Sequence, residues 1–270
     1  MAKQKKMKND RALRFYNQVL DLERLHYGMW LPEDEVNFDN LRAAQQRYED
    51  HLIKHIPEGT KKILDVGCGT GVMSRNLKAL GFDVEGLSPD ITQKDIFAEK
   101  VHAPFHFVRF EDFTGENKYD LIIMSESSQY IPLKSVFKVA SEHLKNNGHL
   151  MMCDFMPFRK ATGVFRKSGH IYEDLLEEAK SNEFKTLIDE DITEKTTKTL
   201  IITRNLLDKV MLSLDLATEK VRIRYPRLTK FILWLFRKKI AFHKENARLL
   251  DPEQFAANKT YRFMLFQKTV

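Results

Sequence analysis

Nine residues, Ile63 to Gly71, restrict the fold of this chain of 270 residues more than any other segment. They read Ile-Leu-Asp-Val-Gly-Cys-Gly-Thr-Gly, an apolar run containing Asp65 and then glycine at every second position. The pattern predicts a strand, a tight turn and a helix, with a backbone that a ligand can approach closely. Dinucleotide folds space their glycines as Gly-x-Gly-x-x-Gly, so the alternate spacing indicates another ligand. Asp65 would face that ligand from the end of the strand.

Strands and helices alternate after this turn, which predicts a parallel sheet covered on both faces. The expected strands are 62–66, 83–87, 105–110, 119–125 and 149–155. The expected helices between and after them are 72–80, 92–99, 133–144 and 171–180.

The two ends of the chain depart from this alternation. Two helices are expected before the sheet, at 11–25 and 37–56. A sixth strand is expected at 184–188 and a last one at 261–268, with a long helical stretch, about 194–250, between them. Connections of this length usually carry a function.

The nonapeptide at its strand–helix junction resembles motif I of the class I S-adenosylmethionine-dependent methyltransferases. The likeness extends from about residue 12 to the C-terminus and is nearest to the branch acting on tocopherols, sarcosine or phosphoethanolamine, and fatty acids (the cyclopropane-synthase-like enzymes). It implies an α/β, Rossmann-like, doubly wound sheet of seven strands, mostly parallel with an antiparallel last strand. It also implies S-adenosylmethionine as the cofactor and methyl transfer to a small-molecule acceptor, lipophilic or amine-bearing.

The resemblance also divides the chain into segments. Residues 1–10 would be a disordered basic tail and 11–58 a helical lid. The cofactor-binding core would be 59–193 and 258–270, with 194–257 inserted as a helical cap over the substrate mouth.

In the family, the acid and glycines after the first strand surround the methionine and ribose moieties. This carries over to Asp65, Gly67, Gly69 and Gly71, whereas Cys68 serves as the small residue that the turn needs. The alternative is a Rossmann turn that holds a different nucleotide.

The second strand departs from the family pattern, because Ser88 occupies the position of the acid that grips the ribose hydroxyls. Lipid- and tocopherol-methylating relatives also replace this acid and keep a Ser-Pro pair. Asp90 would reach the ribose instead, or would cap the following helix. The missing acid also disfavours a nicotinamide dehydrogenase.

The ends of the third and fourth strands supply the next candidates. Glu111 or Asp112 would accept a hydrogen bond from the adenine amino group, unless both are solvated loop acids. Ser125 would line the cofactor through its backbone. Tyr130 stands where relatives often carry a histidine near the transferable methyl group, and it is a candidate catalytic residue.

His170, in the loop after the fifth strand, is the other catalytic candidate, as a general base for a hydroxyl or amine. The alternative is an ordinary surface histidine. Near the N-terminus, Tyr16, Tyr27 and Trp30 are candidates for a lid over the cofactor, with helix packing as the alternative. The residues that hold bicarbonate in cyclopropane synthases are not recognisable, which disfavours cyclopropanation.

Charge and cysteine content limit the partners. Residues 1–11 carry a net charge of +4 and residues 221–250 one of +8. Because the whole chain carries +6, the remaining residues have a net charge of −6. A mildly acidic core, without the Asn/Asp-Pro-Pro-aromatic motif of enzymes that methylate nucleic-acid bases, argues against a nucleic-acid partner. Two cysteines without zinc-like spacing predict no structural metal and fit a reducing compartment.

The segment 222–242 is both basic and aromatic, with Leu228, Phe231, Ile232, Leu235 and Phe242 on one helical face. It would either contact an anionic membrane peripherally or, as we favour, form a buried cap helix. No signal sequence or membrane-spanning run is recognisable, so we expect a cytoplasmic enzyme, or one peripheral at the inner membrane face.

Three alternatives to small-molecule methylation remain at this stage. One is a nicotinamide-dependent oxidoreductase, and the second is a non-catalytic lipid- or protein-binding module on the same fold. The third, an RNA methyltransferase, fits the charge distribution less well.

Overall fold

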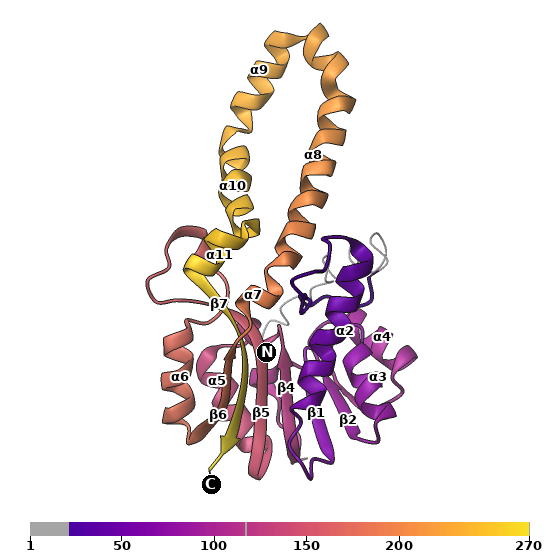
Figure 1. Ribbon diagram of the computed structural model, residues 1–270, viewed down its shortest axis with the longest axis vertical. Helices are drawn as coiled ribbons and strands as arrows, with labels where there is room; N and C mark the ends of the chain where they lie inside the picture. Colours follow the sequence, from indigo (N-terminus) through magenta and orange to yellow (C-terminus); the bar gives the residue numbers. More distant parts are fainter. Residues whose placement is uncertain (1–21, 117, 270) are drawn as a thin grey trace, which may run out of the picture.

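A seven-stranded sheet with the order β3-β2-β1-β4-β5-β7-β6 forms the centre of the computed structural model, which describes residues 22–116 and 118–269 (Figure 1). Its strands are β1 (Lys62–Val66), β2 (Asp83–Leu87), β3 (Phe105–His106), β4 (Tyr119–Ser125), β5 (Leu144–Pro157), β6 (Phe184–Asp191) and β7 (Lys259–Lys268). All neighbours pair in parallel except β7, which runs antiparallel to both β5 and β6. The predicted fold class is confirmed.

Helices cover both faces of the sheet, as the continuous apolar strands predict. The helices of the body are α2 (Phe38–Lys54), α3 (Val72–Ala79), α4 (Ile91–Lys100), α5 (Leu133–His143), α6 (Tyr172–Ser181) and α7 (Thr193–Thr196). Short 3₁₀ turns lie at η1 (Phe110–Asp112), η2 (Ser128–Tyr130) and η3 (Gly163–Arg166).

Alternate strand residues enter two separate cores. Leu64 and Ile122 pack with Phe137 of α5 and Leu175 of α6 on one face. Their neighbours in sequence, such as Ile63, pack with residues of α2 and α3 on the other face. Two buried faces fix the register of these strands, because a slip of one residue would exchange the cores.

Four strands have bounds that differ from the sequence prediction, among them β7, which begins at Lys259 rather than at residue 261. β3 is only two residues long because its pairing with β2 is limited to the positions of Phe105 and His106. β5 begins at Leu144, the last residue of the expected helix 133–144, and its register against β4 shifts there while Asn147 adopts a φ of 59°. β6 continues to Asp191 because β7 pairs along all of it.

The N-terminal part of the chain leads into the sheet through α2, capped by the Asn37 side chain. The basic tail 1–10, Tyr16 and most of the first expected helix lie outside the described residues. Residues 22–25 at the end of that helix are not helical. The lid segment, defined here as residues 22–30, crosses the carboxyl ends of the strands.

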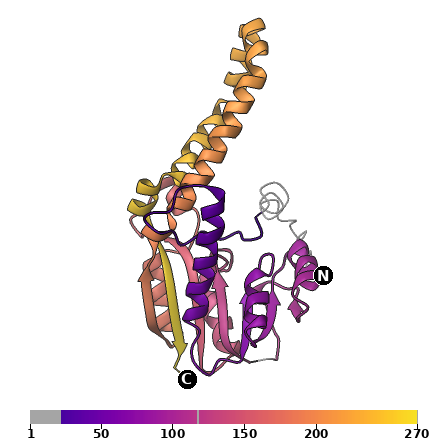
Figure 2. The same ribbon diagram turned by 45° about the vertical axis from the view of Figure 1, so that its right-hand side comes forward.

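The segment between β6 and β7 is helical, as predicted, but it is not a buried cap. Its helices are α8 (Lys198–Arg224), α9 (Pro226–Leu235), α10 (Arg237–Ala247) and α11 (Pro252–Asn258), with the 3₁₀ turn η4 (Arg248–Leu250) before α11. Residues 198–247, from α8 to α10, form an arm that rises from the sheet edge and folds back on itself (Figures 1 and 2). α9 and α10 contain no buried residue, so our preference for a buried cap helix was wrong.

Candidate cofactor and acceptor site

The glycine turn after β1 forms the first wall of the site. Gly67, Gly69 and Gly71 all have positive φ, between 57° and 77°. A Cβ on Gly67 would lie 2.4 Å from the Cβ of Ser127, so a side chain there collides with the loop after β4. A Cβ on Gly69 would meet only Leu25 Cδ1 at 3.9 Å. The space beside Gly69 is therefore open, although its own N–H donates to the side chain of Gln93 at 3.1 Å.

Asp65 lies directly beneath this turn. Its side chain is buried, and its Oδ2 accepts a 2.5 Å hydrogen bond from Ser74 Oγ of α3. Burial raises the pKa of Asp65 to about 6, although the bond from Ser74 opposes the change. The carboxyl group is thus held in place near the end of the strand, and a hydroxyl or amino group of a ligand would stabilise its charged form.

At the end of β2 the structure gives Asp90 the capping role. Asp90 Oδ1 accepts from the backbone N–H groups of Thr92 and Gln93, at 2.8 and 3.1 Å, and begins α4. The Ser88 hydroxyl in turn accepts from the Asp90 N–H at 3.2 Å. Both side chains lie buried at the strand end, which therefore presents a short hydroxyl and a capping carboxylate.

Glu111 and Asp112 lie in η1, at the end of the sheet near β3. Glu111 is half-buried and lies 3.8 Å from Arg109. Asp112 is exposed and lines a hollow of about 370 Å³ together with aromatic residues, among them Phe105 and Phe113. An acid and aromatic rings thus lie together at this end of the sheet.

The end of β4 contains a strained residue. Glu126 has a φ of 50°, which is uncommon outside glycine and clusters at functional sites. Its Oε1 accepts from the N–H of Tyr27 at 2.6 Å and from the hydroxyl of Tyr261 at 2.5 Å. Burial raises the pKa of Glu126, while these two bonds oppose it. Ser125, next to it, has its hydroxyl 2.9 Å from that of Tyr48 in α2.

Hydrogen bonds hold the lid segment to both the glycine turn and the end of β4. Thr70 of the turn donates to the carbonyl of Glu23 at 2.6 Å, and Tyr27 is held by Glu126. Tyr27 thereby lies at the end of β4. The lid segment thus connects the two parts of the site that the sequence placed far apart.

Trp30 has a different environment from the one expected. It is 4% exposed and packs with Leu41 and Ile202 in a separate cluster, while its Nε1 donates to Thr199 Oγ1 of α8 at 2.8 Å. The Gly28 N–H donates to the same hydroxyl at 3.1 Å. These contacts tie the lid segment to the base of the arm, rather than closing Trp30 over a cofactor.

Aromatic rings gather beside Glu126. The ring of Tyr27 lies 5.4 Å from that of Tyr261, 6.2 Å from Phe155 and 6.5 Å from Phe255, measured between centroids. These four residues, which we call the aromatic cluster, come from the lid segment, β5, α11 and β7. The cluster brings together residues from both ends of the chain at the carboxyl end of β5.

A buried cation and a buried acid adjoin the aromatic cluster. Lys259 Nζ lies 4.6 Å from the centroid of Phe155 and donates to Ser168 O and Oγ, at 2.9 and 2.7 Å. Burial lowers the pKa of Lys259 to about 8, and nearby Asp154 opposes this. Burial likewise raises the pKa of Asp154 to about 7, although the Ser128 hydroxyl donates to it at 2.7 Å.

His170 comes to the same region. Its Nε2 lies 2.8 Å from the carbonyl oxygen of Ser128, in the loop after β4. Burial lowers its pKa, which hydrogen bonds to the backbone of Ser128 and Ile131 oppose. A neutral imidazole that donates to a carbonyl holds two loops together and keeps its ring orientation fixed.

The two remaining candidates, Tyr130 and Cys68, lie in different settings. Tyr130 is 79% exposed, so a proton transfer at its hydroxyl would compete with water, and this argues against its expected catalytic role. Cys68 is buried against Phe97 and Val101, which is the packing role expected of a small residue in the turn.

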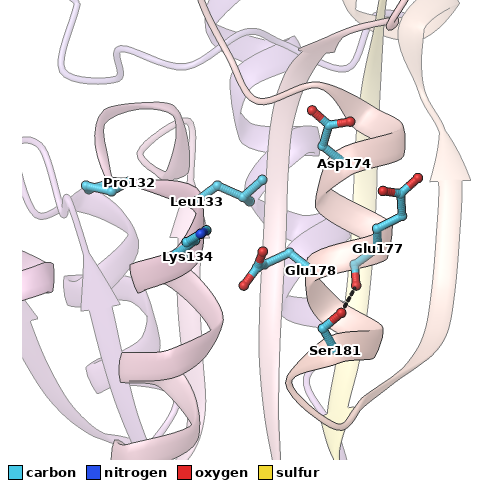
Figure 3. Close-up of a pocket in the computed structure, with 7 residues that line it drawn as sticks. All are labelled: Pro132, Leu133, Lys134, Asp174, Glu177, Glu178 and Ser181. Atoms are coloured by element: carbon cyan, nitrogen blue, oxygen red, sulfur yellow. Dashed lines mark hydrogen bonds between the residues drawn. The ribbon is translucent and has the colours of Figure 1, made fainter.

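Another hollow, of about 490 Å³, lies between α5 and α6 (Figure 3). Asp174, Glu177 and Glu178 of α6 face it from one side, with Pro132 to Lys134 on the other. None of the strand-end residues described above lines it, so we do not assign it to the cofactor or the acceptor.

Sequence reasoning did not select Glu126, Tyr48, Tyr261 or Lys259. Glu126 had a local signal, since it is an acid directly after a buried strand. Tyr261 and Lys259 had none, because only the antiparallel register of β7 against β5 brings them to Phe155 and Pro157.

The doubly wound sheet, the glycine turn and the acids at the strand ends together define the class of S-adenosylmethionine-dependent methyltransferases. Residues 40–186 match the family described as "Methyltransferase domain", and the chain belongs to this family. The predicted enzyme class and cofactor are confirmed. The nicotinamide oxidoreductase and the non-catalytic module are set aside.

Curated relatives share part of the chain. It is 23% identical over 207 residues to the ubiquinone biosynthesis O-methyltransferase of Rickettsia akari, covering 68% of this chain and 81% of that protein. It is 27% identical over 118 residues to the protein of the same name from Bradyrhizobium diazoefficiens, covering 41% and 46%. The chain thus spans about half the length of several curated relatives that it matches.

Solved structures share the fold along nearly the whole chain. A protein from Galdieria sulphuraria described as a sarcosine dimethylglycine methyltransferase gives a TM-score of 0.72 at 20% identity, covering 96% of this chain and 99% of that one. The geranyl diphosphate C-methyltransferase of Streptomyces coelicolor A3(2) gives 0.67 at 16% identity, covering 93% and 92%. The [4+2]-cyclase SpnF gives 0.68 at 20%, covering 96% and 93%. Because these structures differ in reaction, the acceptor has to be argued from the site.

Proposed function

We propose that this methyltransferase transfers the methyl group of S-adenosylmethionine to a small acceptor that is lipophilic and carries a hydroxyl or an amine. The aromatic cluster beside Glu126 is the observation that carries this proposal. Its Tyr27 and Phe155 rings are partly exposed, whereas Tyr261 and Phe255 are buried. Exposed aromatic faces hold apolar rings and chains, and they also attract organic cations. Both kinds of acceptor fit this chemistry.

The cofactor would lie across the carboxyl ends of β1 to β4, where doubly wound sheets bind their ligands. Bound S-adenosylmethionine supplies a methyl group that is already activated. The residues proposed to line it are Asp65, Gly67, Cys68, Gly69, Gly71, Ser88, Asp90, Glu111, Asp112, Ser125 and Tyr27. Glu126 and the lid segment would keep water away from the methyl group and hold the acceptor in line with it.

Proton removal from a hydroxyl or amine needs a neutral base near physiological pH. His170 meets this condition, because its lowered pKa keeps the imidazole neutral. Lys259, with a pKa of about 8, is the second group that could receive a proton. Methylation on oxygen is favoured over nitrogen by the names of the curated relatives, which are O-methyltransferases.

A peripheral membrane contact through residues 222–242 belongs to the same proposal. A lipophilic acceptor partitions into a bilayer, so an enzyme that methylates it benefits from contact with the surface. The exposed apolar and basic residues of this segment support that contact.

The test has two parts. Calorimetry should detect binding of S-adenosylhomocysteine and none of NAD. Labelled methyl from S-adenosylmethionine should then enter the lipid-soluble fraction of a cell extract. Label found only in RNA, or only in polar amines, would contradict the lipophilic acceptor, and absence of any transfer in the presence of bound cofactor would contradict the enzyme.

A further inference from the structure

The arm exposes an unusual amount of apolar surface. Among the described residues, all but five of the exposed large apolar side chains lie between Leu207 and Phe242 of the arm. The only buried residues of α8 are Leu200 and Ile202, at its base. Apolar surface on this scale on a water-soluble protein marks an interaction site.

The far end of the arm is strongly basic. We call residues 220–239, from the last turn of α8 to the start of α10, the tip. The tip carries eight Lys or Arg and no Asp or Glu: Lys220, Arg222, Arg224, Arg227, Lys230, Arg237, Lys238 and Lys239. Among the described residues, only Arg222 of these forms an ion pair, with Asp215. The tip therefore presents a concentrated positive charge.

Aromatic residues are interleaved with these cations. Phe231 stacks on Trp234 with 6.0 Å between ring centroids, and both rings are more than half exposed. The Arg237 guanidinium lies 4.7 Å from the ring of Trp234, and Lys239 lies 5.6 Å from Phe236. Rings beside cations are typical of helices that lie in the headgroup region, where apolar atoms insert and the charges remain at the phosphates.

The dimensions of the arm favour contact with a bilayer surface over crossing. None of the helices within residues 22–116 and 118–269 is long and apolar enough to span a membrane. α9 and α10 have 10 and 11 residues, about half the length of a spanning helix.

A second copy of the chain is a poorer occupant for this surface. Pairing two tips would bring together eight positive charges from each copy with no acid between them. An anionic lipid surface is complementary in charge and in polarity, and it accepts the exposed aromatic rings as well.

We infer that the arm is an anionic-lipid anchor whose tip lies in the headgroup region of a bilayer. The inference deepens the proposed function, on which it rests, by naming the lipid class and the residues that meet it. The base of the arm contacts the lid segment through Thr199 and leads through η4 into Phe255 of the aromatic cluster. A surface-bound arm would thus place the acceptor side of the site toward the membrane.

Vesicle flotation of the full chain tests the inference. The protein should float with vesicles of phosphatidylcholine and phosphatidylglycerol, and at least tenfold less with phosphatidylcholine alone. Replacing three tip cations (Arg237→Gln, Lys238→Gln, Lys239→Gln) should reduce flotation several-fold. A matched variant that removes three exposed lysines from the body (Lys138→Gln, Lys180→Gln, Lys185→Gln) should float like the unmodified protein.

Trp234 supplies a second readout. Its fluorescence should shift to the blue and be quenched by brominated lipid only when anionic vesicles are present, and Trp234→Phe identifies the signal against that of buried Trp30. Equal flotation of the two charge variants, unquenched Trp234, or self-association that the tip variant abolishes would overturn the inference. Binding of S-adenosylhomocysteine without vesicles would show that the proposed function stands even where the anchor fails.

Discussion

The backbone N–H of Tyr27 donates to Glu126 Oε1 at 2.6 Å, joining the lid segment to the end of β4 across 99 positions of sequence. The same carboxylate oxygen receives the hydroxyl of Tyr261 from the last strand. One acid therefore holds the lid segment, the centre of the sheet and its antiparallel edge together.

Removing this carboxylate should weaken cofactor binding. Glu126→Ala leaves the Tyr27 N–H and the Tyr261 hydroxyl without their acceptor, which costs about 1–3 kcal/mol. We expect roughly tenfold or greater loss of affinity for S-adenosylhomocysteine in calorimetry. Tyr261→Phe removes one of the two donors and should cost less. A larger loss of affinity in Tyr261→Phe than in Glu126→Ala would contradict the role given to the Glu126 carboxylate.

Gly67 should not tolerate a side chain. In Gly67→Ala the new Cβ meets Ser127 Cβ at 2.4 Å and the residue keeps a φ of 77°, so both collision and backbone strain arise. We expect about 2–4 kcal/mol of destabilisation in urea unfolding and loss of cofactor binding. Gly59→Ala is the control, since Gly59 has a similar φ of 80° but no atom within 4 Å of the new Cβ. Equal losses in the two variants would show that strain alone acts at Gly67.

Asp154 should make stability depend on pH in an unusual direction. Its folded pKa, about 7, lies above the ordinary value of 3.8, so its ionisation lowers stability as pH rises through this interval. Asp154→Asn should therefore increase the free energy of unfolding at pH 8 by about 1–2 kcal/mol relative to its effect at pH 4.

Asp120 provides a control of opposite sign. Its burial would raise the pKa, but hydrogen bonds from Lys145 and from the N–H groups of Lys62 and Lys61 lower it. Its contribution is present above the ordinary value and is lost as pH falls, so Asp120→Asn should destabilise most at neutral pH. If the effect of both substitutions on the free energy of unfolding changed with pH in the same direction, the opposite pKa shifts of Asp154 and Asp120 would be contradicted.

The Thr199 hydroxyl should be important for the stability of the lid segment. Its hydroxyl accepts from both Gly28 and Trp30, so Thr199→Val leaves two donors without a partner and costs about 1–3 kcal/mol. Hydrogen exchange of residues 26–30 should accelerate. Thr203→Val, one turn later, loses only a bond to its own helix and should leave this exchange unchanged.

The central sheet was predictable because its signals are local. A buried strand, a glycine turn and a following helix appear within nine residues at 63–71, and the other strands repeat the apolar pattern. The predicted ends of strands were wrong where pairing with a neighbouring strand determines them. β3 ends after His106 because its neighbour β2 ends at Leu87 in the same register, and no feature of residues 107–110 reports this.

The proposed acceptor side was less predictable because strands far apart in the sequence assemble it. Lys259 and Tyr261 become neighbours of Phe155 only through the antiparallel register of β7. The environment of Trp30 was mispredicted for a related reason. An aromatic residue in a lid segment can either close over a ligand or anchor the segment. Trp30 anchors it because of its hydrogen bond to Thr199, which lies 169 positions away in the sequence. The arm misled because its composition fits a buried helix as well as an exposed one.

β6 and β7 lie side by side in the sheet, although 67 residues separate Asp191 from Lys259 in the chain. The arm therefore begins and ends at the same place in the sheet, and the pairing of β6 with β7 does not depend on the length or sequence of the arm. Closing a longer connection costs little, about 0.6 kcal/mol for each doubling of its length. In this fold, an insertion between β6 and β7 can therefore change where in the cell an enzyme acts, while the strands and loops that would carry out methyl transfer stay unchanged.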